Sequence, residues 1–242
     1  MVVFKKEEKD YMKSLKSKLI LFTASLIIIL SVVTLGVGVF TSYHGIVKSV
    51  EEDLQANGHT ADLAISSNIA LLKGQIQSMC GLDYMSSDAD VASKLNFLEE
   101  MKKANDFLSV SLINPNGIIS SKDAAINGKT VSDETILHRA LSGETVITEP
   151  DYNEKGDFVI NLYSSTTDRK HIVMATVDGL FLADIVKGYK IGKTGNLFIV
   201  GKDGTTIADT DPNLVKEKNN FILVAQTDKK AESAAKVYKK MS

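Results

Sequence analysis

The twenty-two residues from Leu19 to Phe40 carry no charged side chain, and they constrain the chain more than any other segment. At about 1.5 Å per residue, a helix of this length reaches roughly 33 Å, enough to cross a hydrocarbon core of about 30 Å. A single helix also satisfies its own backbone polar groups within lipid. The segment therefore predicts a transmembrane helix.

The residues before this helix predict its orientation. This segment contains three acidic residues and six lysines, which are Lys5, Lys6, Lys9, Lys13, Lys16 and Lys18. Basic residues beside a span stay on the cytoplasmic side. We expect residues 1–18 to be a cytoplasmic leader, residues 19–40 to lie in the cell membrane, and the remainder to be extracytoplasmic.

The alternative for residues 19–40 is a cleaved signal peptide. Its apolar region usually has about 7–15 residues and ends at a small-x-small site. The segment here is longer, and Val37–Ser42 makes a poor cleavage site. Both observations favour an uncleaved anchor. A later apolar run, Ile172–Val186, is interrupted by Asp178 and Asp184, so we expect the chain to cross the membrane once.

Composition limits the function of the part that follows. Hydrophobic residues make up 44% and charged residues 24%, which is ordinary for a folded domain. A net charge of −2 gives no reason to expect nucleic acid as a partner. The lone Cys80 has no partner for an internal disulfide. It is either an unpaired thiol in a small pocket or a bridge between two chains, and the first is favoured.

Residues 41–82 lack proline, and their apolar or small side chains recur at helical spacing, which predicts a long stalk helix. We expect a weak point in it at Asn57-Gly58. Large residues are few on its apolar stripe, so two readings stay open. The helix pairs loosely with a second copy in a homodimer, or it packs only on its own domain. Val91–Asn105 is a further predicted helix.

The pattern then changes to strands. Phe107–Ile113 and Ile118–Ser120 flank the turn Asn114–Gly117 and predict a hairpin. A helix is expected at Ser132–Leu141, with Ser132 as N-cap. Three more strands are expected at 145–149, 158–164 and 171–177. Together they predict an α+β fold with a five-stranded antiparallel sheet. We expect six side chains of this sheet to lie in or beside one core, namely Val110, Leu112, Phe158, Ile160, Ile172 and Met174.

The hairpin recurs 87 residues later, where the turn Gly201–Gly204 joins Leu197–Val200 to Thr205–Ala208. This repetition suggests two similar modules in series. A helix is predicted at Asp228–Met241. The second module lacks counterparts of three strands, so we expect it to be incomplete and the chain truncated. Leu197, Ile199 and Ile207 would then be uncovered, and local stability should fall near Gly188.

The order of these segments resembles a known family. The basic leader, apolar helix, long helix and the motifs SLINPNGII, VSD, ALSGETVITEP, VDG and IGKTGNLFIVGKDGTTIAD are similar to the double Cache (dCache-type) sensor of bacterial methyl-accepting chemotaxis proteins. The most specific motif is Lys190–Gly195 leading into the second hairpin. The resemblance implies a PAS-like membrane-distal Cache module at residues 83–188 and part of a membrane-proximal one at 189–242. The expected function is ligand sensing in chemotaxis, with cytoplasmic signalling partners present only in a full-length parent.

The resemblance also implies a site. In the family a small ligand lies between the distal sheet and the helix and loop after the first hairpin. Members that bind amino acids have an arginine and two aromatic residues there, where this chain has Glu134, Ile136 and Leu137. A tyrosine and an aspartate of the family become Asp151 and Asn153, while the aspartate of the last strand is kept as Asp178. The ligand ammonium therefore keeps one acid, and the carboxylate clamp is lost.

Four side chains have competing interpretations from the residues alone. Asp178 ends an apolar strand and is either an anchor for a ligand amine or a turn aspartate beside Gly179. Tyr163 and Tyr152 are candidate ligand contacts whose alternative is packing or surface exposure. Arg139 carries a charge suited to a carboxylate, with simple solvation as its alternative.

Enzymatic motifs fail on spacing. Gly128–Thr130 and Gly192–Thr194 copy the end of a phosphate-binding loop, but Asp123 and Lys187 stand where its first glycine is required. The four histidines show no metal-ligand spacing, and no cofactor motif occurs. We expect no enzyme activity within these residues. Alternatives for the whole remain the sensor half of a histidine kinase or a cyclic-dinucleotide cyclase, or an anchored binding protein with no output domain.

Overall fold

The computed structural model describes residues 2–191 and 195–227 of the chain. The predicted helix Asp228–Met241, and residues 192–194 of the Lys190–Gly195 motif, lie outside the described residues. The helices are α1 (Val2–Cys80), α2 (Asp83–Ser86), α3 (Val91–Ala104), α4 (Glu134–Leu141), α5 (Phe181–Lys187), α6 (Pro212–Lys216) and α7 (Phe221–Thr227). The strands are β1 (Ser109–Ile113), β2 (Ile119–Ser120), β3 (Val146–Ile147), β4 (Asp151–Tyr152), β5 (Phe158–Ser165), β6 (Ile172–Asp178), β7 (Lys190–Ile191), β8 (Gly195–Asn196), β9 (Ile199–Val200) and β10 (Thr206–Ala208).

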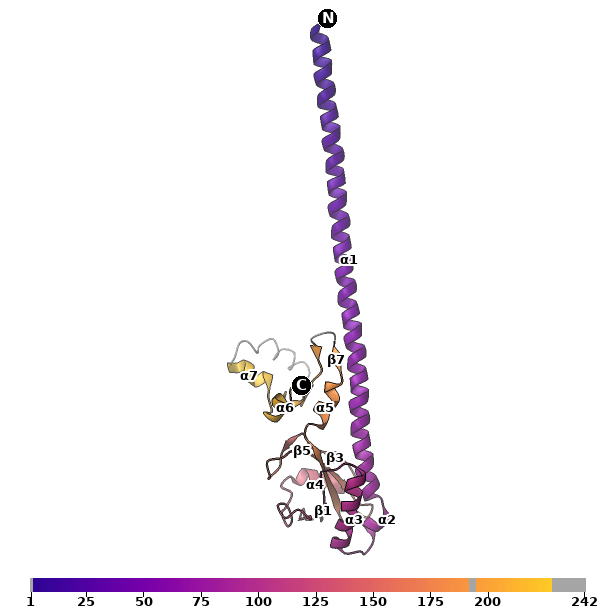
Figure 1. Cartoon of the computed structure of the whole chain (residues 1–242), viewed down its shortest axis with the longest axis vertical. Helices are drawn as coiled ribbons and strands as arrows, with labels where there is room; N and C mark the ends of the chain where they lie inside the picture. Colours follow the sequence, from indigo (N-terminus) through magenta and orange to yellow (C-terminus); the bar gives the residue numbers. More distant parts are fainter. Residues whose placement is uncertain (1, 192–194, 228–242) are drawn as a thin grey trace. The chain divides into compact units, whose positions relative to one another are not determined.

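The predicted membrane segment and stalk form one continuous helix, α1 (Figure 1). It runs unbroken through the expected weak point, although the chain divides into compact units between Ala56 and Asn57. The large apolar side chains of residues 19–40 are all between 55% and 69% exposed. Within the described residues, α1 is the one helix long and apolar enough to cross a membrane.

An antiparallel sheet organises the second unit. Its strand order is β2-β1-β6-β5-β3. Strand β4 also pairs with β5, along the same edge of β5 as β3. The five predicted strands are therefore all present, and the α+β prediction is confirmed. The count of five was wrong by one, because Asp151–Tyr152, which lies between two of the predicted strands, pairs with Val159 and Phe158 as a sixth strand.

The sheet buries both faces, and this corrects the expected single core. Val110, Leu112 and Ile160 face α1 and α3, in a cluster with Ile76 and Leu98. In contrast, Ile172 and Met174 lie in a second cluster on the opposite face, beside Leu137 of α4, and Phe158 packs against a third. The reason is register: Val110 pairs with Ala175 and Leu112 with Val173, so residues 172 and 174 point to the other side.

Local hydrogen bonds explain where elements begin and end. The N-cap of α4 is Asp133 rather than the predicted Ser132, because its carboxylate accepts the N–H groups of Thr135 and Ile136. In both hairpin turns the fourth residue, Gly117 or Gly204, donates its N–H to the carbonyl of the first and has a positive φ. The two turns thus share one geometry, as the repeated sequence predicted.

The second hairpin is better covered than expected. Leu197 and Ile199 are partly buried against a cluster formed by Ala183, Val186, Ala208 and Val215. The expectation that their face is uncovered was therefore wrong, because α5 and α6 cover it. We had expected only further strands to do so. Ile207 is half-buried.

Cys80 reports on the packing of α1 against the sheet. Its thiol donates to the carbonyl of Ser164 at 3.3 Å, and burial raises its pKa to about 12. Because the thiolate is the reactive form, maleimide labelling of the native chain at pH 8 should be far slower than labelling in urea. Mass spectrometry of timed samples measures both rates. Equal rates in the two conditions would contradict this packing.

Candidate functional site

The sheet face that carries α4 has a polar end and an apolar end. Ser109, Thr176 and Asn161 form one row across β1, β6 and β5, and the Thr176 hydroxyl donates to the Asn161 amide oxygen at 2.9 Å. The next row, Ser111, Met174 and Tyr163, marks the change to apolar side chains. Strand alternation keeps these groups on one face. The polar end can therefore offer hydroxyl and amide groups to a solute.

A cavity of about 500 Å³, here called the sheet cleft, lies at this polar end. Its volume falls within the usual range of small-molecule sites. It is lined by Leu108, Ser109, Asp123, Asn153, Lys155, Asp157, Phe158, Val159, Thr176, Asp178, Leu180 and Lys216. Beside it, the buried hydroxyls of Ser111 and Ser121 are 3.0 Å apart in a hydrogen bond.

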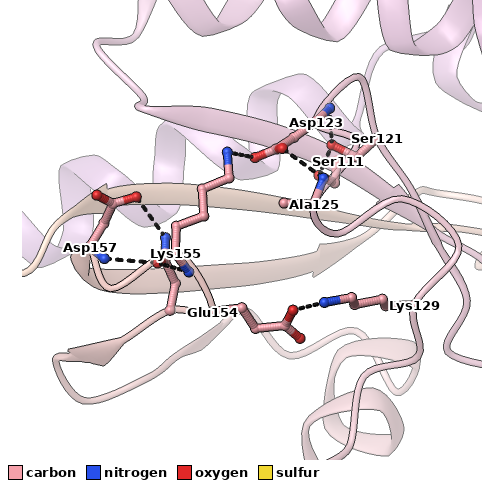
Figure 2. Close-up of polar contacts among 9 residues, drawn as sticks. Ser111, Ser121, Asp123, Ala125, Lys129, Glu154, Lys155 and Asp157 are labelled. Carbon is pink, nitrogen blue, oxygen red and sulfur yellow. Dashed lines mark hydrogen bonds and ion pairs between the residues drawn. The ribbon is translucent and has the colours of Figure 1, made fainter.

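Two ion pairs hold the loop after β2 to the turn between β4 and β5 (Figure 2). Lys155 pairs with Asp123 at the sheet cleft, and Lys129 pairs with Glu154. The hydrogen bond from Lys155 lowers the pKa of the Asp123 carboxyl. The Lys155–Asp123 pair is therefore formed at neutral pH and is lost as the pH falls through that lowered pKa.

A second cavity, here called the hairpin cleft, has a volume of about 610 Å³ and lies between α4, the β3–β4 segment and the second hairpin. Two cations line it, and both are paired. Arg139 donates to Glu144 at 2.8 Å, and Lys218 lies 2.7 Å from Asp151. These bonds raise the pKa of Arg139 and lower that of Asp151.

The structure divides the six predicted site residues among three places. Asp178 and Asn153 line the sheet cleft. Arg139, Asp151 and Tyr152 line the hairpin cleft. Tyr163 lines neither of them and lies instead in the apolar cluster beneath α4, where burial raises its pKa to about 12.

Both interpretations of Asp178 have a counterpart in the structure. Its Oδ1 accepts the N–H of Leu180 at 2.7 Å, which is the bond of a turn aspartate. The residue is nevertheless exposed at the sheet cleft. Arg139, the candidate for binding a carboxylate, forms an ion pair with Glu144 and is not simply solvated.

Sequence reasoning missed Asp123, Lys155 and Thr176. The first two stand 32 residues apart, and no local pattern joins them. Thr176 had a usable signal, because it is a polar residue within an apolar strand run, as Asn161 is in the neighbouring strand. Within the described parts of the chain, no group of three or more His, Cys, Asp or Glu side chains is placed to hold a metal.

The role of the two ion pairs, Lys155–Asp123 and Lys129–Glu154, can be tested. Replacing both Lys129 and Lys155 by methionine should accelerate amide exchange in residues 121–127 and 153–157 by roughly threefold to tenfold, because both ion pairs between these segments are lost and exposed pairs stabilise only weakly. Lys48→Met, which breaks an exposed pair with Glu52 on α1, is the control and should leave these segments unchanged. Unaltered exchange in the double variant would show that the pairs do not hold the turn.

Comparisons with known proteins identify the fold. No family model matches the chain, and no curated protein matches it. Among solved structures, the ligand-binding domain of the Pseudomonas aeruginosa PAO1 amino acid chemoreceptor PctC, in complex with GABA, is 16% identical with a TM-score of 0.52. The match covers 71% of this chain and 81% of that domain.

An extracellular ligand-binding receptor from Desulfohalobium retbaense is 18% identical with a TM-score of 0.51, over 69% of this chain and 33% of that one. At these identities the likeness concerns the fold. The chain has the α+β fold of chemoreceptor ligand-binding domains, with a long apolar helix at its N-terminus.

Proposed function

We propose that this chain is the ligand-sensing region of a membrane-anchored receptor, and that a small polar solute binds in the sheet cleft. The observation that carries the proposal is the polar end of the sheet. Hydroxyl groups of Ser109 and Thr176, the carboxylate of Asp178 and the amide of Asn153 gather at one cavity, whereas the middle of the sheet is covered by apolar clusters. A few polar groups in a cavity are what fixes a small ligand's orientation.

The ligand class follows from the charges at the cleft. Asp178 is an exposed carboxylate that keeps one oxygen beyond its turn bond, and it is suited to an ammonium group. PctC, which shares the fold, is described as an amino acid chemoreceptor and was solved with GABA. An amine-bearing solute is therefore proposed here too. The missing arginine and aromatic pair favour solutes that need no carboxylate clamp.

The proposed topology places the basic leader in the cytoplasm and the sheet outside. The apolar, exposed surface of residues 19–40 supports a membrane span, and the lysines before it support the orientation. Ligand binding would favour one of two arrangements of the sensor, and α1 joins the sheet directly to the span, so it would carry the change inward. A homodimer through α1 is part of this proposal.

The proposed output is that of a methyl-accepting chemotaxis receptor with a double Cache sensor, whose second module begins near Lys190. The repeated hairpin turn supports the two-module organisation. The alternatives are a histidine kinase, a cyclic-dinucleotide cyclase or a binding protein without output. The gene sequence following Ser242 distinguishes them by a HAMP linker and long helical hairpin, a catalytic domain, or a stop codon.

The test is a thermal-shift screen of the full chain in lipid nanodiscs against amino acids, amines and carboxylic acids. A solute that raises the melting temperature is then measured by calorimetry. Asp178→Asn should weaken the binding of an amine-bearing solute by about tenfold or more, since a charged hydrogen bond contributes about 1.5–3 kcal/mol. Asparagine can still accept the Leu180 N–H, so the turn is kept. Asp88→Asn, an exposed residue outside both clefts, is the control and should bind as the parent does. Unchanged affinity in Asp178→Asn would exclude this site.

A further inference from the structure

The turn between β5 and β6 brings an arginine to a small polar pocket, here called the turn pocket. It has a volume of about 260 Å³ and lies at the end of α1, where Gln77 and Cys80 line it together with Ser164 and Arg169. A Cβ added to Gly143 would lie 3.6 Å from Nη2 of Arg169, so the guanidinium lies beside the end of α4. Among the described residues, the turn pocket shares none of its lining with the sheet cleft or the hairpin cleft.

The turn pocket has a positive charge that the protein does not neutralise. Arg169 is the one charged residue among the described residues that line it. It takes part in none of the ion pairs between described residues. The two acids that flank the pocket in the sequence are engaged elsewhere, since Asp168 accepts the hydroxyl of Thr166 at 2.7 Å and Glu144 pairs with Arg139. The Arg169 guanidinium therefore keeps its charge and its donors for an anion.

Neutral donors lie at the same pocket. The Gln77 amide donates one N–H to the Thr145 hydroxyl at 2.9 Å, and the buried hydroxyls of Thr145 and Ser164 are 3.2 Å apart in a hydrogen bond. That bond uses one of the two hydroxyl protons, and the sulfur of Cys80 beside Ser164 is only a weak acceptor for the other. The second N–H of the Gln77 amide is not used in this network. An anionic oxygen would be a stronger acceptor for these donors.

We propose that the turn pocket binds a small oxoanion of the sulfate or phosphate class, held by the Arg169 guanidinium together with hydroxyl and amide donors. Guanidinium groups bind such oxygens through paired N–H bonds. A volume of about 260 Å³ lies below the range of about 300–1,000 Å³ usual for organic ligands, which favours an ion of few atoms. This site goes beyond the solute site proposed for the sheet cleft and does not depend on it.

The experiment is equilibrium dialysis of the full chain, in nanodiscs of zwitterionic lipid, against radiolabelled sulfate. Sulfate also stabilises folded proteins through its exclusion from their surface, so binding is measured directly and not through the melting temperature. Empty nanodiscs give the baseline, and the ionic strength is held constant with chloride. The chain should bind sulfate saturably above that baseline.

Two variants locate the site. Arg169→Asn removes the charge, and asparagine tolerates the positive φ of 57° at this position. Sulfate binding should weaken in it by about tenfold or more, because hydrogen bonds from a charged donor are the strong ones. Gln77→Met removes the amide donors from a side chain of similar length, and should weaken sulfate binding by about threefold.

The matched control is Lys170→Gln. It removes a cation next to Arg169 that lies outside the lining, so sulfate affinity should change by no more than about twofold in screened solution. The rate of Cys80 labelling without sulfate checks the fold of each variant, since loss of the packing between α1 and the sheet would make labelling fast.

Four results would overturn the proposal. The first is the absence of saturable sulfate binding to the parent chain. The second is equal binding by the parent and Arg169→Asn. The third is equal weakening in Arg169→Asn and Lys170→Gln, because sulfate would then respond to net charge alone. The fourth applies if Arg169→Asn labels fast at Cys80, and is unchanged sulfate binding in a folded Gln77→Met.

Discussion

Replacing Ile76 by alanine should lower the free energy of unfolding by about 3 kcal/mol. Ile76 belongs to α1 and is fully buried in the cluster that joins this helix to β1, β5 and β6. Alanine leaves a cavity there, and tightly packed surroundings collapse into it only in part. The denaturant dependence of Cys80 labelling measures the loss, since Cys80 lies in the same cluster.

The control for this prediction lies on the same helix. Leu71 is 61% exposed, so Leu71→Ala should change the free energy of unfolding by no more than about 0.5 kcal/mol. If Ile76→Ala were as mild as Leu71→Ala, α1 would not be packed on the sheet as described. The stalk and the sheet would then be separable, and the proposed transmission of a signal through α1 would fail.

Gly179→Ala should be similarly damaging, with a loss of about 2–4 kcal/mol. A Cβ at this position would lie 2.4 Å from Cδ1 of Phe158 and 2.8 Å from its backbone carbon. The ring alone could turn away, but the backbone carbon cannot move without disturbing β5, because the Gly179 N–H donates to the Phe158 carbonyl at 2.9 Å. The change should therefore loosen the strand ends that line the sheet cleft.

The matched control for Gly179 is Gly74→Ala, in the part of α1 nearest the sheet. A Cβ there meets nothing within 4 Å, and alanine favours a helix over glycine by about 1 kcal/mol. This variant should be slightly more stable than the parent. Urea titration followed by pulse proteolysis compares the two. If Gly179→Ala left the free energy of unfolding unchanged, Phe158 would not pack against the end of β6 as described.

The fold was largely predictable because its signals are local. An uncharged run of twenty-two residues, the turns at Gly117 and Gly204, and strand-length apolar runs each indicate one element without help from the rest of the chain. Register was harder. Strands buried on both faces show no clear alternation, so nothing in residues 172–178 told which side chains face α1.

The site was less predictable, because its residues come together only in three dimensions. Asp178 could be placed by its position after a strand and Asn153 only through the family resemblance, and both line the sheet cleft. Lys155 and Asp123 form a pair across separate loops, which depends on how β4 joins the sheet. Strand β4 itself was missed, because two polar residues in a turn-like stretch carry no strand pattern.

The central claim, that a solute binds at the polar end of the sheet, is tested most directly by hydrogen exchange. The full chain in nanodiscs is compared with and without a solute identified by thermal shift. Binding in the sheet cleft should slow exchange in residues 121–125, 153–158 and 176–180, and leave residues 91–104 of α3 unchanged. Slowed exchange confined to segments outside the sheet cleft would contradict the claim.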